Sequence, residues 1–355
     1  MNDSKLVGIA EIGQLLGVSK QAVVNWRKRY EDFPKPIREL ESGPIWEFRP
    51  VEEWRKKNQG NPTHRISFIN LKGGVGKTTT AVAVAEVLAK EHNLSVLLVD
   101  LDPQTNATVN LIKESVWKKM DDEGATLAQL FEDHINYKQQ PKFDIEKAIV
   151  RGVSNVHGGI PKLDLLPSSV KLIELQDELP LIAARGNYET RPVEILSKAL
   201  EPILDRYAYV IIDCPPSLGP ITKNGLRIST SYVIPTIPDI ISTWGVYQIV
   251  EKVKEFSKPY NISIHPLGIV ATKVQSNGLH DAYLNILERG QLFDGKSTSA
   301  KQPPLFKNQI KQTVNVARGA NSEQDLRTLK LKYGSDYDAF QGLTKEIIER
   351  CNTPN

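Results

Sequence analysis

Short apolar runs, separated by longer amphipathic stretches, dominate the chain from residue 65 onward. Five of these runs predict strands: Arg65–Asn70, Leu94–Leu101, Tyr207–Asp213, Ser231–Thr236 and Leu267–Thr272. Several of them are continuously apolar, which is typical of strands covered on both faces. Helical patterns lie between them, at Thr78–His92, Glu194–Leu204 and Gly245–Phe256. Strands that alternate with helices predict an α/β domain with a mainly parallel twisted sheet flanked by helices.

The pattern is less regular between residues 113 and 162. Turn-forming stretches there predict loops around one helix at about Leu127–His134. A further strand is predicted at Leu163–Leu166. We find no internal repeat and no low-complexity tract, so this region belongs to the same α/β domain.

The first sixty residues have a different pattern, which predicts a small separate domain. Apolar residues at helical spacing in Ile9–Leu16 predict a first helix, Gly17 a turn, and Ser19 the N-cap of a second helix. A hairpin-like segment at 39–48 and a third helix at Pro50–Lys57 follow. This order predicts a winged helix-turn-helix, which resembles the small units of excisionase and MerR-like proteins.

Turn-forming residues at Asn58–Pro62 mark the boundary between the two parts. We therefore predict a winged helix-turn-helix DNA-binding domain at residues 1–60 and an α/β domain at residues 61–355.

Composition narrows the class of protein. Of 355 residues, 40% are hydrophobic and 25% charged, as in ordinary globular proteins. No apolar run is long enough for a transmembrane helix, the N-terminus lacks a secretory apolar core, and two cysteines give no disulfide framework. These features predict a cytoplasmic protein. The net charge is only +3, but residues 296–332 hold eight Lys/Arg and two acids, a net +6.

The segment FINLKGGVGKTTT, residues 68–80, predicts a phosphate-binding loop. Glycines at 73, 74 and 76 let backbone N–H groups approach phosphate oxygens, and the following helix adds a positive partial charge. Lys77 is placed to neutralise the β and γ phosphates, and the Thr78 hydroxyl to bind Mg²⁺. The usual motif G-x-x-x-x-G-K-[ST] fails at its first glycine, where Leu71 stands.

A second lysine, Lys72, lies five residues before Lys77. Two lysines of one subunit would crowd the same phosphates. A lysine pointing out of the loop could instead reach a nucleotide held by a facing subunit, like a finger supplied in trans to a transferring phosphoryl group. The alternative is that Lys72 is a solvated loop charge.

The loop matches K-G-G-x-x-K-[ST], and at this point the chain resembles the deviant Walker A family of ParA, Soj and MinD. Residues 99–108, VDLDPQTNAT, are similar to the family segment VDLDPQGNAT, with Thr105 in place of the glycine. Residues 209–217, YVIIDCPPS, are similar to its Walker B segment. The resemblance covers about residues 65–350 and implies a P-loop NTPase fold.

The resemblance also implies roles for particular residues. Lys72 would act across an ATP-sandwich homodimer, and Lys72, Lys77 and Asp102 would be catalytic. Asp102 would polarise the attacking water, whereas Asp100 is interpreted as structural and Cys214 as a buried filler. Thr78, Asp102 and Asp213 would hold Mg²⁺. The residues expected to bind ATP are Lys72, Gly73, Gly74, Val75, Gly76, Lys77, Thr78 and Thr79.

DNA contacts are harder to transfer from the family. Where the family often has I-P-R-N-V-R, this chain has IKQTVN at Ile310–Asn315, without the proline and both arginines. Lys311, Arg318, Lys330 and Lys332 are predicted to make non-specific contacts instead. The alternative is that they are scattered solvated charges.

The second helix of the N-terminal domain would display Lys20, Gln21, Asn25 and Arg27. Gln and Asn can bind adenine, and Arg guanine or phosphate, so these residues are the predicted operator contacts. Because one such helix buries little surface, two copies on a palindrome are expected. An adaptor or dimerisation role is the alternative.

The leading hypothesis is a ParA-type ATPase for plasmid or chromosome partition, nucleoid-associated, stimulated by a ParB-like centromere-binding partner and repressing its own operon through the N-terminal domain. One alternative is a transcriptional repressor that uses ATP only as a switch. Another is a MinD-like positioning ATPase, which needs an amphipathic membrane anchor. The tail at residues 339–350 has few large apolar residues and is predicted to be a packed helix.

Overall fold

The computed structural model describes residues 5–16, 20–30, 32–40, 42–58, 63–182, 191–290, 302–312 and 322–353. The chain divides into two compact units. One consists of Met1–Thr63 with Lys198–Ala208, and the other of His64–Ser197 with Tyr209–Asn355.

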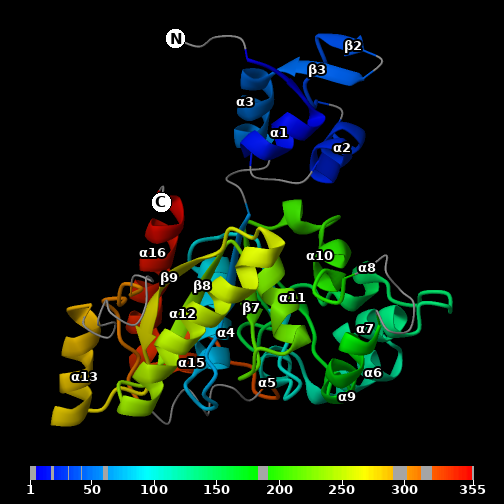
Figure 1. Cartoon of the computed structure of the whole chain (residues 1–355). Helices are drawn as coiled ribbons and strands as arrows, with labels where there is room; N and C mark the ends of the chain where they lie inside the picture. Colours follow the sequence, from blue (N-terminus) through cyan, green and yellow to red (C-terminus); the bar gives the residue numbers. More distant parts are fainter. Residues whose placement is uncertain are drawn as a thin grey trace. The chain divides into compact units, whose positions relative to one another are not determined.

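The larger unit is built on a six-stranded sheet in the order β6-β5-β7-β4-β8-β9. Its strands are β4 His64–Phe68, β5 Val96–Asp100, β6 Leu163–Leu166, β7 Tyr209–Asp213, β8 Ser231–Thr236 and β9 His265–Ala271. All neighbouring strands are parallel, and helices pack around the sheet (Figure 1). Every residue of β5, β7 and β8 is buried, which explains why these strands are continuously apolar in the sequence.

Helices and short 3-10 turns follow most strands. Their bounds are α4 Lys77–Lys90, α5 Asn106–Leu111, α6 Glu114–Asp122, α7 Leu127–Ile135, α8 Ile145–Ala148, α9 Leu172–Glu178, η1 Leu179–Leu181, α10 Ile195–Leu200, α11 Pro220–Ile228, α12 Ile240–Tyr260, α13 Gly278–Glu288, α15 Leu329–Tyr333, η3 Gly334–Asp336 and α16 Tyr337–Asn352. The end of α10 and the turn η2 Leu204–Arg206 belong to the segment Lys198–Ala208 of the smaller unit. The predicted mainly parallel α/β fold is confirmed.

Three helices differ from the predictions, each for a local reason. Helix α6 was not predicted, and only the turn-forming stretch at its end, residues 121–124, was expected as a loop; α6 is a charged surface helix without a buried residue. Helix α12 begins at Ile240 rather than at Gly245, because Asp239 caps it and accepts a hydrogen bond from the Ser242 N–H. Helix α10 ends at Leu200, before Pro202.

Helix α16 is the packed helix predicted for the tail. Its apolar residues Phe340, Leu343 and Ile347 are fully buried, and the helix contacts α4. Full burial of one such side chain stabilises a fold by about 1.5–3 kcal/mol. The apolar face of α16 is therefore used inside the unit.

The smaller unit contains β1 Leu6–Gly8, α1 Ile9–Leu16, α2 Lys20–Arg29, β2 Arg38–Leu40, β3 Gly43–Glu47 and α3 Phe48–Asn58. The strands form an antiparallel sheet in the order β1-β3-β2. Its core is rich in aromatic residues: Val7, Ile12, Val23, Trp26, Phe33, Trp46, Val51 and Trp54. The hairpin and the three helices lie where the sequence predicted them.

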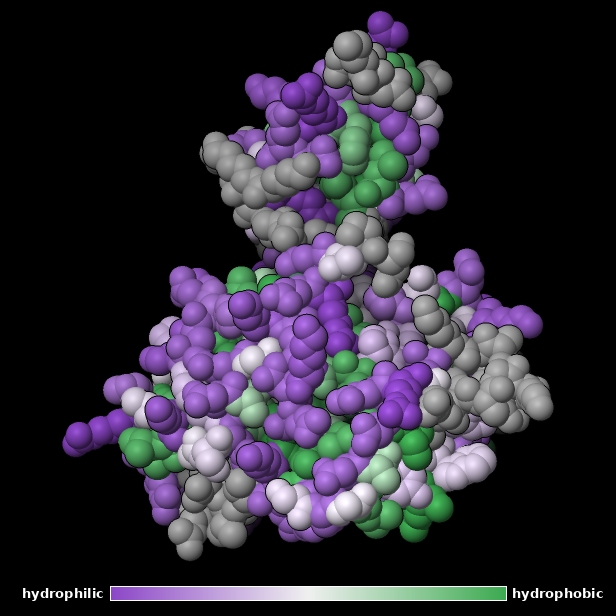
Figure 2. Space-filling model, turned by 90° about the vertical axis from the view of Figure 1, so that its left-hand side faces the viewer, coloured by the Kyte–Doolittle hydropathy of each residue, from purple (hydrophilic) through white to green (hydrophobic). Residues whose placement is uncertain are grey.

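Hydrophilic residues predominate on the face of the molecule shown in Figure 2, and hydrophobic residues gather in a few separate areas. Among the described helices, none combines the length and the apolar content needed to cross a membrane.

Candidate nucleotide site

The loop between β4 and α4 has the backbone conformation that its glycines allow. Gly74 and Gly76 have φ angles of 72° and 81°, in the left-handed region that strains residues with a Cβ. The Thr272 hydroxyl, just after β9, donates to the Val75 carbonyl at 2.7 Å and holds the loop from the second strand along the sheet. Helix α4 begins at Lys77, so its first free N–H groups lie at the end of the loop.

Lys77 lies inside the site, and only 6% of it is exposed. Its Nζ donates to the Lys72 carbonyl at 3.3 Å. Burial lowers the pKa of Lys77, and the charges of Asp213 and Asp102 oppose that shift. The ammonium therefore faces two carboxylates at the end of the phosphate loop.

Strand register places the acidic residues of the site. Asp100 pairs with Asp213 across β5 and β7, and Phe68 pairs with Asp213 across β4 and β7. The phosphate loop, the Asp100–Asp102 segment and Asp213 therefore leave the sheet side by side. Ligands of open α/β sheets bind at this carboxyl edge.

Asp100 has a structural role, as the sequence indicated. Its carboxylate accepts hydrogen bonds from the N–H and hydroxyl of Thr108, at 2.9 and 2.7 Å, and from the Asp102 N–H at 3.1 Å. Burial raises the pKa of Asp100 to about 7, although these bonds oppose the shift. Both oxygens of the carboxylate therefore accept hydrogen bonds from the same chain, and these bonds hold the turn that carries Asp102.

Asp102 is also close to the loop, at 5% exposure. Its Oδ1 accepts from the Gln104 N–H at 3.0 Å, and its carbonyl accepts from the Ser168 hydroxyl at 2.8 Å. Its backbone is thus fixed from both sides, and no hydrogen bond to the described residues is found for Oδ2. The position fits a carboxylate that orients a water.

Asp213 differs sharply from Asp100. It is fully buried, and among the described residues neither carboxylate oxygen has a hydrogen-bond partner of good geometry. Burial and then the Asp100 charge raise the pKa of Asp213, and the nearby Thr78 hydroxyl and Lys77 only partly oppose this. A buried carboxylate without partners fits a group that binds a cation, and Mg²⁺ is usually held by one or two carboxylates plus phosphates and waters.

Lys72 points to a different part of the chain. Its Nζ lies 3.0 Å from Asp239 Oδ2 and 2.9 Å from the Ser242 hydroxyl. Its backbone N–H donates to Asn70 Oδ1, and the Asn70 amide donates to the Pro235 carbonyl. The sequence alone does not point to Asn70, Asp239, Ser242 or Thr272, because their contacts depend on where the loop, β8 and β9 lie in the fold.

Thr105, which stands where the family has glycine, adopts a φ of 57°. This left-handed residue comes directly before α5, and its N–H donates to the Asp102 carbonyl at 2.9 Å. A β-branched residue is strained in this conformation. The backbone at this turn thus keeps the shape that a glycine would adopt without cost.

Cys214 is fully buried, and burial raises the pKa of its thiol to about 12. A buried, protonated thiol is a poor nucleophile. The prediction of a filler role agrees with this environment.

The predicted DNA contacts differ in their exposure. Lys20, Lys311 and Lys330 are exposed. Arg27 forms a salt bridge of 2.6 Å with Glu39 on strand β2 of the hairpin. Arg318 and the side chains of Gln21 and Asn25 lie outside the described residues.

Lys332 does not fit the predicted role, and that prediction is wrong. Only 1% of Lys332 is exposed, and its Nζ lies 2.9 Å from the buried Glu86 carboxylate. Ser154 and Tyr333 donate to the same carboxylate. Leu329, Lys332 and Tyr333 have the i, i+3, i+4 spacing of one helix face, so the fold turns Lys332 inward.

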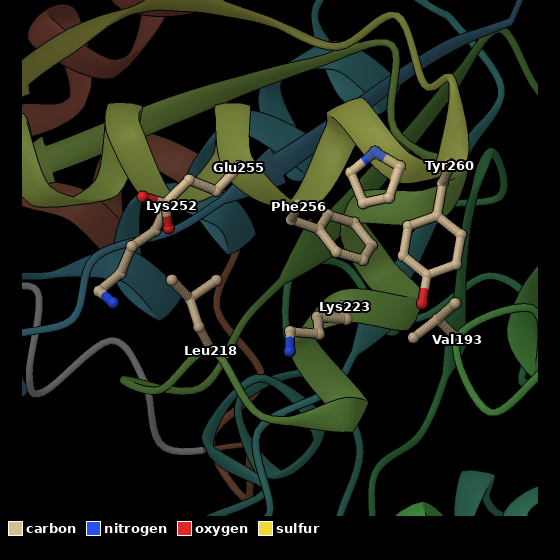
Figure 3. A pocket seen from close by; sticks show the side chains of 8 residues that line it. Val193, Leu218, Lys223, Lys252, Glu255, Phe256 and Tyr260 are labelled. Atoms are coloured by element: carbon tan, nitrogen blue, oxygen red, sulfur yellow. The ribbon is translucent and has the colours of Figure 1, made fainter.

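A hollow of 390 Å³ lies between α11 and α12. It is lined by Val193, Leu218, Lys223, Lys252, Glu255, Phe256, Pro259 and Tyr260. Figure 3 shows the rings of Phe256 and Tyr260 side by side on α12, with Lys223 opposite on α11. None of the predicted site residues lines this hollow.

Comparison with known proteins decides the family. A sequence profile described as "AAA domain" matches residues 63–265, more than half of the chain. The sporulation initiation inhibitor protein Soj of Bacillus subtilis is 36% identical over 211 residues, which cover 59% of this chain and 73% of Soj. The chain belongs to the ParA/MinD family of P-loop ATPases.

Two further comparisons extend this ParA/MinD-family assignment. The virulence plasmid ParA family protein pGP5-D of Chlamydia psittaci is 29% identical over 284 residues, 79% of this chain and 93% of pGP5-D. The structure of an ATP complex of a McdA variant from Cyanothece superposes with a TM-score of 0.61 at 20% identity, covering 81% of this chain and 97% of McdA. The second likeness concerns the fold alone.

Proposed function

We propose that this chain is a ParA-type ATPase that partitions DNA through ATP-dependent dimerisation and hydrolysis. The observation that carries the proposal is the two-lysine phosphate loop at the carboxyl edge of the sheet. Lys77 faces Asp102 and Asp213 inside the site, while the Lys72 ammonium lies outside it. Relatives named as Soj and as a plasmid ParA family protein support this function.

ATP and Mg²⁺ are the ligands that the site fits. The N–H groups of Gly73–Thr79 would surround the β and γ phosphates, and Lys77 would neutralise their charge. The Thr78 hydroxyl would hold Mg²⁺, and the partnerless Asp213 carboxylate would hold it through water. Magnesium supplies charge neutralisation to the phosphate oxygens.

Hydrolysis then needs a positioned water. Asp102 would orient this water toward the γ phosphorus and receive its proton, while the bond to the β–γ bridging oxygen breaks and ADP leaves. Asp100 would only position the Asp102 backbone, because its carboxylate already accepts hydrogen bonds from Thr108 and Asp102. Lys72 of a facing subunit would stabilise the charge on the transferring group.

Exposed apolar residues follow two of the strands at the carboxyl edge of the sheet, where a facing subunit would cover them. Val170 and Ile173 follow β6, and Ile240, Ile241 and Trp244 follow β8. Each is 50–69% exposed. Parallel strands end at one edge of the sheet, so these residues follow strands that end at the edge of the phosphate loop, and a facing subunit would cover them there.

DNA would be bound in two ways. Non-specific binding by the ATP dimer would use exposed Lys311 and Lys330, with Arg318, and would associate the protein with the nucleoid. The winged helix-turn-helix would bind an operator through Lys20, Gln21, Asn25 and Arg27 and repress its own operon. A ParB-like partner would stimulate hydrolysis and release the dimer.

An ATP-switched repressor is the second candidate function, favoured by the helix pair and hairpin of the smaller unit. A MinD-like anchor at α16 gains no support, since Phe340, Leu343 and Ile347 are buried against the domain.

Two variants of the full chain test the proposal. Lys311→Gln with Lys330→Gln should weaken ATP-dependent binding to any sequence and reduce its salt dependence. Lys20→Gln should weaken binding only to the chain's own promoter DNA. If random DNA were bound equally with and without ATP by the unmodified protein, the partition proposal would be rejected and the repressor favoured.

A further inference from the structure

The ammonium of Lys72 is held within its own subunit. It lies 3.0 Å from Asp239 Oδ2 and 2.9 Å from the Ser242 hydroxyl, both at the start of α12. The Lys72 side chain is 35% exposed and that of Asp239 25%. The lysine therefore sits in a partly shielded ion pair and does not reach freely into solvent.

The Asp239 carboxylate is fixed independently of the lysine. Its Oδ1 accepts from the Ser242 N–H at 2.7 Å, which caps α12. Burial raises the pKa of Asp239, but the hydrogen bond from Ser242 and the contacts with Lys72 outweigh it and leave the pKa below its usual value. The Asp239 carboxylate is therefore charged, and its hydrogen bond at the N-terminus of α12 orients it to accept from Lys72.

The same helix turn carries exposed apolar residues. Ile240, Ile241 and Trp244 are 57%, 69% and 63% exposed. The Lys72 ammonium is bound at the base of this turn, through Asp239 and Ser242. Any subunit that covered the turn would bring its own charges close to this ion pair.

We propose that Asp239 and Ser242 form a latch that holds Lys72 in cis and restrains ATP-driven dimerisation. The inference rests on the proposed action of Lys72 in trans. Dimerisation then requires each Lys72 to exchange the Asp239 carboxylate for a triphosphate of the facing subunit. Asp239 is a positioning residue for Lys72, and the latch sets the concentration at which the dimer forms.

The size of the effect follows from population arithmetic. A ligand's apparent affinity falls by the fraction of protein in the competent state, and a dimer contains two latches. A partly exposed ion pair that favours the latched state about twofold leaves Lys72 free in about one third of the subunits, and with two latches it weakens the dimer by about three squared. Opening both latches should therefore tighten the dimer about tenfold.

Asp239→Asn in the full chain tests this. Asparagine is as good an N-cap as aspartate, so α12 keeps its start while the charge is lost. Asp144→Asn is the matched control, because Asp144 caps α8 in the same way and makes no contact with Lys72. Ser242→Ala removes the second acceptor and should act in the same direction by less.

Two readouts are needed. Without nucleotide, an amine-reactive reagent followed by peptide mass spectrometry should modify Lys72 at least twofold faster in Asp239→Asn than in the unmodified protein or Asp144→Asn. With ATP and Mg²⁺, sedimentation should show a dimer dissociation constant lowered about tenfold in Asp239→Asn and unchanged in Asp144→Asn.

The outcomes separate the latch from the proposed function. Unchanged Lys72 modification in Asp239→Asn overturns the latch, whatever happens with ATP. Faster modification with an unchanged or weaker dimer also overturns it, since the contact then restrains nothing. If the unmodified protein forms no dimer with ATP, the proposed function fails first, and the modification experiment alone shows whether Lys72 is held.

Discussion

Asp100 and Asp213 are register partners on the adjacent parallel strands β5 and β7, and their carboxylates have opposite surroundings. Asp100 accepts three hydrogen bonds from Thr108 and Asp102. Asp213 is equally buried, and neither of its oxygens has a hydrogen-bond partner of good geometry among the described residues. Asp100 thus helps to hold the local fold, whereas the surroundings of Asp213 suit a group that binds a ligand, a cost in stability that functional sites often carry.

Asp213→Asn should therefore stabilise the free protein while removing its Mg²⁺-dependent hydrolysis. Burial raises the folded-state pKa of Asp213, so above about pH 4 the folded protein must retain a proton that the unfolded chain releases. The stability contribution is fully present below the unfolded pKa and is lost as pH rises toward the folded pKa. The advantage of Asp213→Asn should grow as pH rises above the unfolded pKa, by at most about 1.4 kcal/mol per pH unit.

Thermal unfolding at pH 5, 6 and 7 measures this, with Asp100→Asn as the control. Asparagine cannot replace both oxygens of Asp100, so the control should be destabilised by about 1–3 kcal/mol. A constant difference between Asp213→Asn and the unmodified protein across this range would show that Asp213 is ionised without cost.

Asp102→Ala should still bind ATP and hydrolyse it slowly, because Lys77, Thr78 and the loop amides remain. Loss of a positioned acid–base group typically costs 10²–10⁴-fold in rate. Single-turnover hydrolysis and nucleotide binding, measured on one sample, separate the two steps. The dimer should persist longer with ATP, and an unchanged turnover rate would remove Asp102 from catalysis.

The sequence predicted the phosphate loop because its glycines and Lys77 lie between a strand pattern and a helix pattern, and it predicted Asp102 and Asp213 through the resemblance to the ParA, Soj and MinD family. Strands β6 and β8 were predicted with their observed bounds, since most of their residues are buried and apolar. Asp239 and Ser242 were not predicted, because they lie 167 and 170 positions after Lys72 in the sequence and contact it only in the folded chain. The surface helix α6 was missed, as it buries no residue.

Thr105→Gly should stabilise the larger unit. The φ of 57° at Thr105 costs a residue with a Cβ about 1–2 kcal/mol, and glycine avoids that strain at some entropic cost to the folded state. We expect a net gain of about 0.5–1 kcal/mol in the free energy of unfolding, measured by urea denaturation. Thr105→Ala is the control, because it keeps a Cβ and should gain nothing; equal gains in both variants would indicate a different cause.

Lys330 and Lys332 should separate DNA binding from folding, although only one residue lies between them. Lys332→Met leaves Glu86 buried without its cation and should destabilise the protein by about 3–5 kcal/mol. Lys330→Gln changes an exposed side chain and should leave stability within about 0.5 kcal/mol. Random-sequence DNA binding should fall for Lys330→Gln and be retained by the folded fraction of Lys332→Met; the reverse result would return Lys332 to the DNA surface.

Lys72→Ala tests the second lysine of the loop directly. ATP binding should persist, because Lys77 and the loop amides are unchanged, whereas Lys77→Ala should abolish it. Loss of one charge contact to phosphate across an interface should cost roughly 2–5 kcal/mol of association, which is visible by sedimentation at micromolar protein. Hydrolysis and random-sequence DNA binding should fall with the dimer.

Lys72→Ala and Asp239→Asn should act in opposite directions, although each breaks the same ion pair. The first removes the cation itself, so no contact to a facing triphosphate can form. The second removes only the carboxylate that holds the cation in cis, so the lysine is released for the facing subunit. If both variants weakened the ATP dimer, the Lys72–Asp239 contact would belong to the dimer itself, and the second lysine would need its aspartate in order to act.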